Sequence, residues 1–413
     1  MVYKILVVED SPVVQNVLKH LLSQLTIYVP TVCSCYKEAE TTLASQKGGE
    51  FFTAIVDLNL PDAPNGEIVD LVLGSGVSCI VLTGNFNDDL RLELLNKGVL
   101  DYITKDSRYS FDHVIKVIER LRKNQHIKAL VADDSSTSRL FVKSLLEQYR
   151  FNVVEAEDGQ QALAKLEEDP EIRLFITDHD MPIINGHDLV RMLRHNNRFK
   201  NLVVIGLSTG NDSALSAKFI KAGANDFLKK PFYHEEFHCR ITHNLESQEM
   251  LETIRDLANI DVLTKLKNRR YLFDEGESFY KQAISQGNGA GFAMLDLDHF
   301  KCVNDTYGHM VGDTLLELVG KEIGLAFPES LVCRFGGEEF CIVSDEEDDV
   351  FEQRLIDFQV SLREKEFTGA KIKVTCSIGV CRKNQDSLDD AVRVADKKLY
   401  QAKSNGRDRI EFD

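Results

Sequence analysis

Short apolar runs alternate with amphipathic segments along the first 240 residues of the chain. Runs such as 5–8 and 129–132 are apolar throughout and stop at a pair of acidic residues. The segments 13–25 and 138–149 repeat their apolar residues at helical spacing. Strands that alternate with helices in this way predict βα units around a parallel sheet, with functional groups gathered at the carboxyl ends of the strands.

This pattern of strands and helices occurs twice. The matched stretches are 5–11 with 129–135, 55–57 with 176–178, 82–84 with 207–209, and 102–105 with 227–230. We therefore predict two similar α/β domains in tandem.

Each repeat places the same types of polar residue at its strand ends. In the first repeat these residues are Glu9, Asp10, Asp57, Thr83 and Lys105, and in the second they are Asp133, Asp134, Asp178, Ser208 and Lys230. The acids can hold Mg²⁺, and the central carboxylate can attack a phosphoryl group that the metal screens. The lysine would neutralise the acyl phosphate, and the hydroxyl would bond it. A loop cap explains any single acid here, but it does not explain four matched positions that occur twice.

Both repeats resemble the receiver domains of response regulators, which have a flavodoxin-like (CheY-like) sheet. The resemblance implies that Asp57 and Asp178 are phosphoacceptors, that the acidic pairs bind Mg²⁺, and that Tyr102 and Phe227 are switch aromatics.

The second repeat follows the receiver pattern more closely than the first. It has Gly186 at the expected distance and a Lys-Pro pair at 230–231, where the family has a cis peptide. The first repeat has one additional residue before Gly66, and Asp106 stands where the proline is expected. Asp178 is therefore a slightly better match to a phosphoacceptor than Asp57, but neither repeat lacks its acceptor, so the sequence does not decide which receiver switches.

A different pattern begins near residue 290 of the chain. The apolar run 292–295 predicts a buried strand that ends at Asp296. Because side chains alternate along a strand, Asp296 and Asp298 share a face, and Leu297 can offer only its backbone carbonyl to an ion there.

A second strand, predicted over 331–335, is followed by Gly336 and Gly337 and then by Glu338 and Glu339. Two glycines between strand-like runs indicate a two-residue hairpin turn, because the favoured turns need positive φ. The hairpin would bring two more carboxylates beside the first strand end, a set of oxygen ligands that suits Mg²⁺.

The last third of the chain resembles the GGDEF domain of diguanylate cyclases. The resemblance is carried by 336–340, by 296–301 and 304–313 before it, by 261–270 upstream, and by 395–403 and 405–407 downstream. It implies an α+β sheet of the nucleotidyl-cyclase or polymerase-palm type.

The resemblance assigns roles to the acids and to one lysine of this domain. Asp296, the carbonyl of Leu297, and Glu338 are the implied Mg²⁺ ligands, and Glu339 would hold a second metal. Glu338 is also the candidate base for the ribose 3′-hydroxyl, and Lys301 would stabilise charge on the reacting phosphates. Without the motif around it, Lys301 would be interpreted as a surface lysine. We interpret Asp298 as structural.

Substrate binding is assigned in the same way. Asn304 and Asp313 match the residues that select guanine, although Asp313 also stands where it could simply cap a helix. Lys403 and Arg407 flank a helix stop at 405–406, where they could bind phosphate or only compensate the helix dipole.

Composition limits the remaining classes of function. The chain has 413 residues, 43% of them hydrophobic, which is enough for about three packed domains. A net charge of −17 argues against nucleic-acid or anionic-membrane binding, and no apolar run is long enough to span a membrane. Nine scattered cysteines without a C-x-x-C pair predict reduced thiols in the cytoplasm, with Cys33 a buried strand thiol.

We predict a first receiver over 1–124, a second over 125–240, a linker helix over 241–260 and the cyclase domain over 261–413. Met250, Ile254 and Leu257 fall near heptad spacing within the linker. Two heptads are equally compatible with a coiled coil across a dimer and with a solvated helix.

The sequence thus predicts a response regulator that converts two GTP into cyclic di-GMP, works as a homodimer and receives its phosphoryl group from a histidine kinase or phosphotransfer protein. The alternatives are a catalytically silent GTP-binding effector and a signalling scaffold built on receivers. Residues 327–330 lack the Arg-x-x-Asp motif of the family's inhibitory site, so we expect no inhibition by the product through that site.

Overall fold

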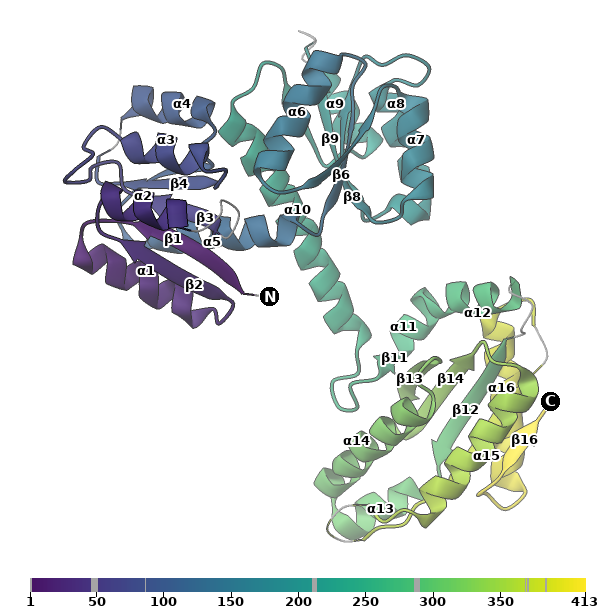
Figure 1. The fold of residues 1–413 in the computed structure, drawn as a ribbon. Helices are drawn as coiled ribbons and strands as arrows, with labels where there is room; N and C mark the ends of the chain where they lie inside the picture. The colour runs from purple at the N-terminus through teal and green to yellow at the C-terminus, as the bar shows by residue number, and fades with distance from the viewer. Residues whose placement is uncertain are drawn as a thin grey trace. The chain divides into compact units, whose positions relative to one another are not determined.

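The computed structural model describes residues 2–45, 51–85, 87–209, 214–285, 290–367, 369, 371–382 and 385–413. The chain divides into two compact units, Met1–Glu249 and Met250–Asp413. Figure 1 shows the helices and strands of each unit, and each unit is described by itself.

The first receiver is a five-stranded parallel sheet in the order β2-β1-β3-β4-β5. Its elements are β1 (Tyr3–Val8), α1 (Pro12–Gln24), β2 (Tyr28–Cys33), α2 (Tyr36–Ser45), β3 (Phe51–Val56), α3 (Glu67–Gly74), β4 (Cys79–Thr83), α4 (Asp88–Lys97), β5 (Asp101–Thr104) and α5 (Arg108–Asn124). Apolar residues of α2, α3 and α4 cover one face of the sheet, and those of α1 and α5 cover the other. The predicted α/β sandwich is confirmed.

The second receiver repeats this architecture in the order β7-β6-β8-β9-β10. Its elements are β6 (Lys128–Ala132), α6 (Ser136–Gln148), β7 (Asn152–Ala156), α7 (Gly159–Glu168), β8 (Ile172–Asp178), α8 (Gly186–His195), a 3₁₀ turn at Asn197–Phe199, β9 (Val203–Ser208), α9 (Ala214–Ala222), β10 (Asp226–Lys229) and α10 (His234–Asn259). The Lys230–Pro231 peptide bond is cis, as its match to the family predicted.

Helix α10 is continuous over 26 residues, as predicted for the linker. Its first half belongs to the second receiver, because Phe237, Ile241 and Leu245 are buried in that domain's core. Farther along, Met250, Ile254 and Leu257 are 64%, 53% and 69% exposed, so the apolar residues at heptad spacing lie outside any core of the described chain.

The two receivers contact each other within the first unit. Arg91 on α4 forms an ion pair with Glu235 at the start of α10. Near the end of α5, Arg120 and Lys123 both bind the Glu249 carboxylate, at 2.9 and 2.7 Å. Helix α10 is therefore held by side chains of the first receiver as well as by the core of the second.

His238 is a buried histidine at this contact, and it makes stability depend on pH. The Tyr149 ring stacks on it at a centroid distance of 3.5 Å, and its Nε2 has no hydrogen-bond partner among the described residues. Burial lowers the pKa of His238 well below its ordinary value of 6.5. The folded protein therefore takes up this proton only at lower pH than the unfolded chain does.

Lowering the pH from 7.5 to 5.5 should cost about 1 kcal/mol of folding stability through His238, since the unfolded state gains the proton first. The stability is fully present above pH 6.5 and is lost as the pH falls below it. Urea unfolding of the wild type and of His238→Phe at both pH values measures this contribution. Equal pH dependence of the two proteins would contradict it.

The second unit is a six-stranded mixed sheet in the order β11-β13-β14-β12-β15-β16. Its elements are β11 (Lys267–Asn268), α11 (Arg269–Asp274), α12 (Gly276–Ser285), β12 (Gly291–Leu297), α13 (Phe300–Tyr307), α14 (His309–Ala326), β13 (Leu331–Gly336), β14 (Glu339–Ser344), α15 (Asp348–Glu364), β15 (Cys376–Cys381), α16 (Leu388–Ser404) and β16 (Ile410–Phe412). Helices α13, α14 and α15 pack on one face, and α11, α12 and α16 pack on the other. The central strand β12 is therefore buried on both faces.

Two predictions from composition can be compared with the structure. All nine cysteines are free thiols, and Cys33 is buried in β2, as predicted. Among the helices of the described residues, none combines the length and the apolar character that crossing a membrane requires.

Candidate functional site

Two antiparallel strands bring the acids of the second unit together. Strand β12 pairs with β14 so that Asp296 lies directly opposite Glu339. One residue farther, the Leu297 N–H donates to the backbone carbonyl of Glu338 at 3.3 Å. Asp296, Glu338 and Glu339 therefore lie together at the end of the central strand, where the sequence predicted them, but their carboxylate oxygens do not all come within 4.8 Å of one another.

Burial and like charge dominate the electrostatics of this acid cluster. Burial raises the pKa of Asp296, and Glu338 raises it further, although Lys403 opposes this from 2.7 Å away. The pKa of Glu339 is raised by burial and by Asp296. Neighbouring carboxylates repel one another, so a cation bound between them would be stabilised. In this structure the ammonium group of Lys403 on α16 supplies that positive charge.

The hairpin between β13 and β14 forms as predicted, but its turn lies one residue later. Gly336 pairs with Glu339, so the turn residues are Gly337 and Glu338. The register shifts between Arg334 and Gly336, where Phe335 is the additional residue. Gly337 has φ of 52°, a conformation that suits glycine, and Glu338 is the second residue of the turn.

Arg334 positions this turn, a role that the sequence analysis missed. Its guanidinium donates to the Gly337 carbonyl from Nε at 3.0 Å and from Nη2 at 2.8 Å, and its Nη1 binds Asp261 at 3.0 Å. Asp261 is fixed in turn by the Thr264 N–H and hydroxyl. An arginine at the base of an acidic turn was the available signal, but its partner lies 73 residues away in the chain.

Asp298 is a structural residue, as interpreted from the sequence. It is 5% exposed and accepts hydrogen bonds from the hydroxyls of Thr375 and Ser377 and from the Asp408 N–H, at 2.8, 2.7 and 3.0 Å. These bonds join β12 to β15 and to the segment before β16.

Asp298→Ala should lower the free energy of unfolding by about 3 kcal/mol, because it leaves buried donors without an acceptor. Chemical denaturation of the full chain measures this loss. Asp305→Ala, which removes an exposed carboxylate on α13, is the matched control and should be nearly neutral. A loss no larger than that of the control would show that the hydrogen bonds of Asp298 do not stabilise the fold.

Asn304 and Asp313 lie on neighbouring helices. A Cβ built at Gly312 would stand 1.9 Å from Asn304 Oδ1, so the glycine leaves room for the Asn304 amide beside α14. Asp313 follows that glycine and is exposed in the second turn of α14. The alternative that Asp313 caps a helix is wrong, because the helix begins at His309 and its N-cap is Gly308.

The predicted phosphate-binding cations are not gathered at one point. Lys301 is exposed on the first turn of α13, and no contact among the described residues joins it to the acid cluster. Lys403, in the last turn of α16, is bound to Asp296. Arg407 is exposed just beyond that helix.

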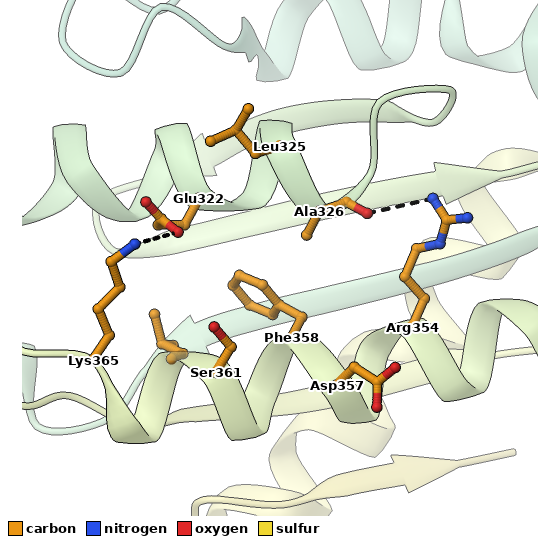
Figure 2. A pocket seen from close by; sticks show the side chains of 9 residues that line it. Glu322, Leu325, Ala326, Arg354, Asp357, Phe358, Ser361 and Lys365 are labelled. Carbon is orange, nitrogen blue, oxygen red and sulfur yellow. Dashed lines mark hydrogen bonds and ion pairs between the residues drawn. The ribbon is translucent and has the colours of Figure 1, made fainter.

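A hollow between α14 and α15 has a volume of about 360 Å³, but it is not part of the predicted site. Figure 2 shows Phe358 among the side chains that line it, together with the ion pair between Lys365 and Glu322 and the bond from Arg354 to the Ala326 carbonyl. None of the predicted site residues lines it.

In the first receiver, Lys105 Nζ lies 2.7 Å from both the Glu9 and the Asp57 carboxylates. Burial raises the pKa of Glu9, although Lys105 opposes the change. Glu9, Asp10 and Asp57 each place an oxygen within 4.8 Å of the others, a spacing that can hold a metal ion. No other three His, Cys, Asp or Glu side chains in the described part of the chain meet that spacing.

In the second receiver, Lys230 occupies the space between the acids. Its Nζ lies 2.7 Å from Asp133, 2.6 Å from Asp178 and 2.8 Å from the Ser138 hydroxyl, which itself donates to Asp133. Burial raises the pKa of Asp178, and Lys230 opposes it. Asp134 is exposed beside this group. A metal would have to displace the lysine and the hydroxyl from Asp133.

The predicted switch residues are placed alike in both receivers. Thr83 and Ser208 end β4 and β9 and are 1% exposed. Tyr102 lies in β5 with its hydroxyl donating to the Asn85 carbonyl at 2.8 Å. Phe227 lies in β10 and packs on Phe219 of α9 at 5.4 Å between ring centroids.

Comparison with known proteins agrees with this division. Residues 5–119 and 129–242 match the response regulator receiver domain, and residues 258–409 match the family described as diguanylate cyclase, GGDEF domain. The chain is 27% identical over 302 residues to the response regulator PleD of Caulobacter vibrioides, covering 68% of this chain and 65% of that protein.

Two further similarities concern parts of the chain. The chemotaxis protein CheY1 of Helicobacter pylori (strain J99) is 41% identical over 107 residues, which is 26% of this chain and 86% of that protein. A solved structure of a two-component system response regulator/GGDEF domain protein is 42% identical, covers 60% of this chain and 99% of its own, and superposes with a TM-score of 0.54.

Proposed function

The chain belongs to the response regulators that carry receiver domains and a diguanylate cyclase, GGDEF domain, and we propose that it condenses two GTP to cyclic di-GMP and two pyrophosphates under the control of receiver phosphorylation. The observation that carries the proposal is the register of β12 and β14, which gathers Asp296, Glu338 and Glu339 at one strand end.

Asp296, the Leu297 carbonyl, and Glu338 would hold Mg²⁺, with Glu339 available to a second ion. Burial, and after it repulsion from neighbouring acids, raises the pKa of Asp296 and Glu339, and a bound cation would offset both effects. Bound Mg²⁺ would supply charge neutralisation on the phosphates and lower the pKa of a nearby hydroxyl. Glu9, Asp10 and Asp57, and their counterparts Asp133, Asp134 and Asp178, would hold Mg²⁺ in the receivers.

Glu338 would accept the proton of a ribose 3′-hydroxyl as that oxygen bonds to the α-phosphorus of the second GTP and pyrophosphate leaves. Its place at the tip of the turn supports this role, since Arg334 holds the turn at the Gly337 carbonyl. Lys403 would release the Asp296 carboxylate and bind a phosphate group of GTP instead. Lys301 and Arg407 would add positive charge near the phosphates.

Asn304 and Asp313 would select guanine. A carboxylate accepts hydrogen bonds from the N1 and N2 hydrogens that guanine presents together, and an amide pairs with N2 and N3. The close approach of α14 to Asn304 at Gly312 supports a shared site for the base.

The working unit would be a homodimer, because each cyclase domain holds one GTP and the product joins two. A histidine kinase or phosphotransfer protein would supply the phosphoryl group to Asp57 or Asp178. The added charge of roughly −1.5 to −2 would bias how α10 presents the cyclase domains to each other. We place the reaction in the cytoplasm, in keeping with nine free thiols.

The test is incubation of the full chain with GTP and Mg²⁺, with and without beryllofluoride, followed by chromatography of the nucleotides. Cyclic di-GMP should form faster with beryllofluoride. Bound GTP without product in both conditions would instead indicate a silent effector. Failure of acetyl phosphate to label Asp57 or Asp178 would favour a scaffold. Turnover that slows as cyclic di-GMP accumulates would contradict the expected lack of product inhibition.

A further inference from the structure

The hydroxyl of Ser138 joins the lysine of the second receiver to one of its acids. Ser138 is the third residue of α6, and it donates to Asp133 Oδ2 at 2.6 Å and accepts from Lys230 Nζ at 2.8 Å. The same ammonium group also donates to Asp133 Oδ2 at 2.7 Å and to Asp178 Oδ1 at 2.6 Å. An ammonium group has three N–H donors, so the bond to Ser138 completes the set of oxygen partners around Lys230.

The first receiver has Val14 at the place of Ser138. Helices α1 and α6 have 13 residues each, and Val14 is the third residue of α1. The residue after it makes the same contact in both receivers. Gln15 and Arg139 each donate to the backbone carbonyl of the first acid of their acidic pair, at 2.6 and 2.7 Å. The two helices therefore have the same register, and an apolar side chain stands in the first receiver where the second has a hydroxyl.

Both contacts of the Ser138 hydroxyl oppose a divalent cation at the acids. Such a cation binds carboxylate oxygens, and Asp133 Oδ2 already accepts hydrogen bonds from the hydroxyl and from Lys230. The hydroxyl also accepts a hydrogen bond from the ammonium group, so it holds a positive charge beside the oxygens that a metal would use.

The lysine bridge is common to both receivers, but the hydroxyl is not. In the first receiver, Lys105 Nζ lies 2.7 Å from both the Glu9 and the Asp57 carboxylates. The side chain of Val14 can neither donate to an acid nor accept from this lysine. The two receivers therefore differ in how firmly the lysine and the first acid are held together.

We propose that Ser138 is a positioning residue that sets the Mg²⁺ concentration at which Asp178 accepts a phosphoryl group. Its hydroxyl stabilises the arrangement in which Lys230 bridges Asp133 and Asp178, and Mg²⁺ must compete with that arrangement. The second receiver consequently requires more Mg²⁺ than it would with an apolar residue at this position. This inference rests on the proposed phosphorylation of Asp178 and concerns the step that precedes it.

Labelling of the full chain with radioactive acetyl phosphate over a range of Mg²⁺ concentrations tests the proposal. The Asp57→Asn substitution is present throughout, so that label reports on Asp178. There an O–P bond forms at the carboxylate while the bond from phosphorus to the acetate oxygen breaks, and acetate leaves. The quantity measured is the midpoint, the Mg²⁺ concentration that gives half of the maximal labelling rate.

Ser138→Val should lower this midpoint by about fivefold or more, because two charge-assisted hydrogen bonds no longer oppose the metal. Ser138→Thr keeps the hydroxyl, so its midpoint should stay within about twofold of that of the parent protein. The reverse change is Val14→Ser in an Asp178→Asn background, and it should raise the midpoint for labelling of Asp57.

A midpoint that is unchanged or higher in Ser138→Val would overturn the proposal. So would a lower maximal rate at an unchanged midpoint, which is the result expected if Ser138 only supports the fold. Absence of label at Asp178 in every variant would remove that acceptor from the proposed function, and this inference with it. Label at Asp178 with the same midpoint in Ser138→Val and its parent would remove the inference alone.

Discussion

Glu338→Gln is expected to slow synthesis of cyclic di-GMP by about 10²- to 10⁴-fold, the usual contribution of a general base. Glutamine keeps the shape of the side chain at the tip of the turn, but it neither accepts the 3′-hydroxyl proton nor adds negative charge for Mg²⁺. Because Arg334 holds the turn through the Gly337 backbone, the substitution leaves that anchor in place. Initial rates with saturating GTP and Mg²⁺ measure the effect.

The matched control is Glu317→Gln, which neutralises an exposed carboxylate on α14 of the same domain. It should keep the wild-type rate, so that a loss at Glu338 cannot be attributed to the change in net charge. Binding of GTP should persist in Glu338→Gln, measured by equilibrium dialysis. A rate within threefold of the wild type would remove Glu338 from the chemistry and leave Asp296 and Glu339 as the remaining acids.

The strands of the cyclase domain were predictable because their signals are local. The apolar run before Asp296 and the two glycines before Glu338 are each visible within ten residues of the chain. The exact turn was not predictable, because the irregularity at Phe335 moves it by one residue and nothing in the local pattern indicates an additional strand residue.

Contacts between distant segments were beyond the sequence. Lys403 reaches Asp296 because α16 packs on the central strands of the sheet, and Arg334 reaches Asp261 in the segment before β11, the strand that pairs with β13. The sequence suggested phosphate binding or dipole compensation for Lys403, whereas its partner in the folded domain is the acid cluster itself. The predicted receiver boundary at residue 240 falls within α10. The buried residues Phe237, Ile241 and Leu245 lie on both sides of it and belong to one core. Their helical spacing could have indicated this from the sequence.

The geometry of the receivers changes how their acids compare. From the sequence, Asp178 is the better match to a phosphoacceptor, yet Asp57 has the assembled cluster with Glu9 and Asp10. A lysine already bridges two of the acids in each receiver, Lys105 in the first and Lys230 in the second, and in the second the Ser138 hydroxyl also donates to Asp133. The acids that meet the spacing of a metal site thus lie in the first receiver, whereas α10 is anchored in the core of the second.

Asp178→Asn should abolish most of the stimulation of turnover by beryllofluoride, whereas Asp57→Asn should remove a smaller share. The reason is the connection of each receiver to the output: α10 follows β10 of the second receiver directly and is anchored in its core through Phe237 and Ile241. In the described part of the chain, the first receiver contacts α10 through the ion pairs of Arg91 with Glu235 and of Arg120 and Lys123 with Glu249. Ratios of the rates with and without beryllofluoride, taken for each variant and for the double variant, measure the two shares.

The control for the indirect route is Glu249→Gln, which weakens both ion pairs to α5 while leaving each phosphoacceptor intact. If the first receiver acts through this carboxylate, Glu249→Gln and Asp57→Asn should reduce the stimulation by similar amounts, and combining them should add little, because both interrupt one path. Stimulation that survives Asp178→Asn at the wild-type ratio would contradict direct control by the second receiver. In that case phosphorylation of Asp57, beside Glu9 and Asp10, would be the switch. The first receiver would then control α10 through Arg120 and Lys123.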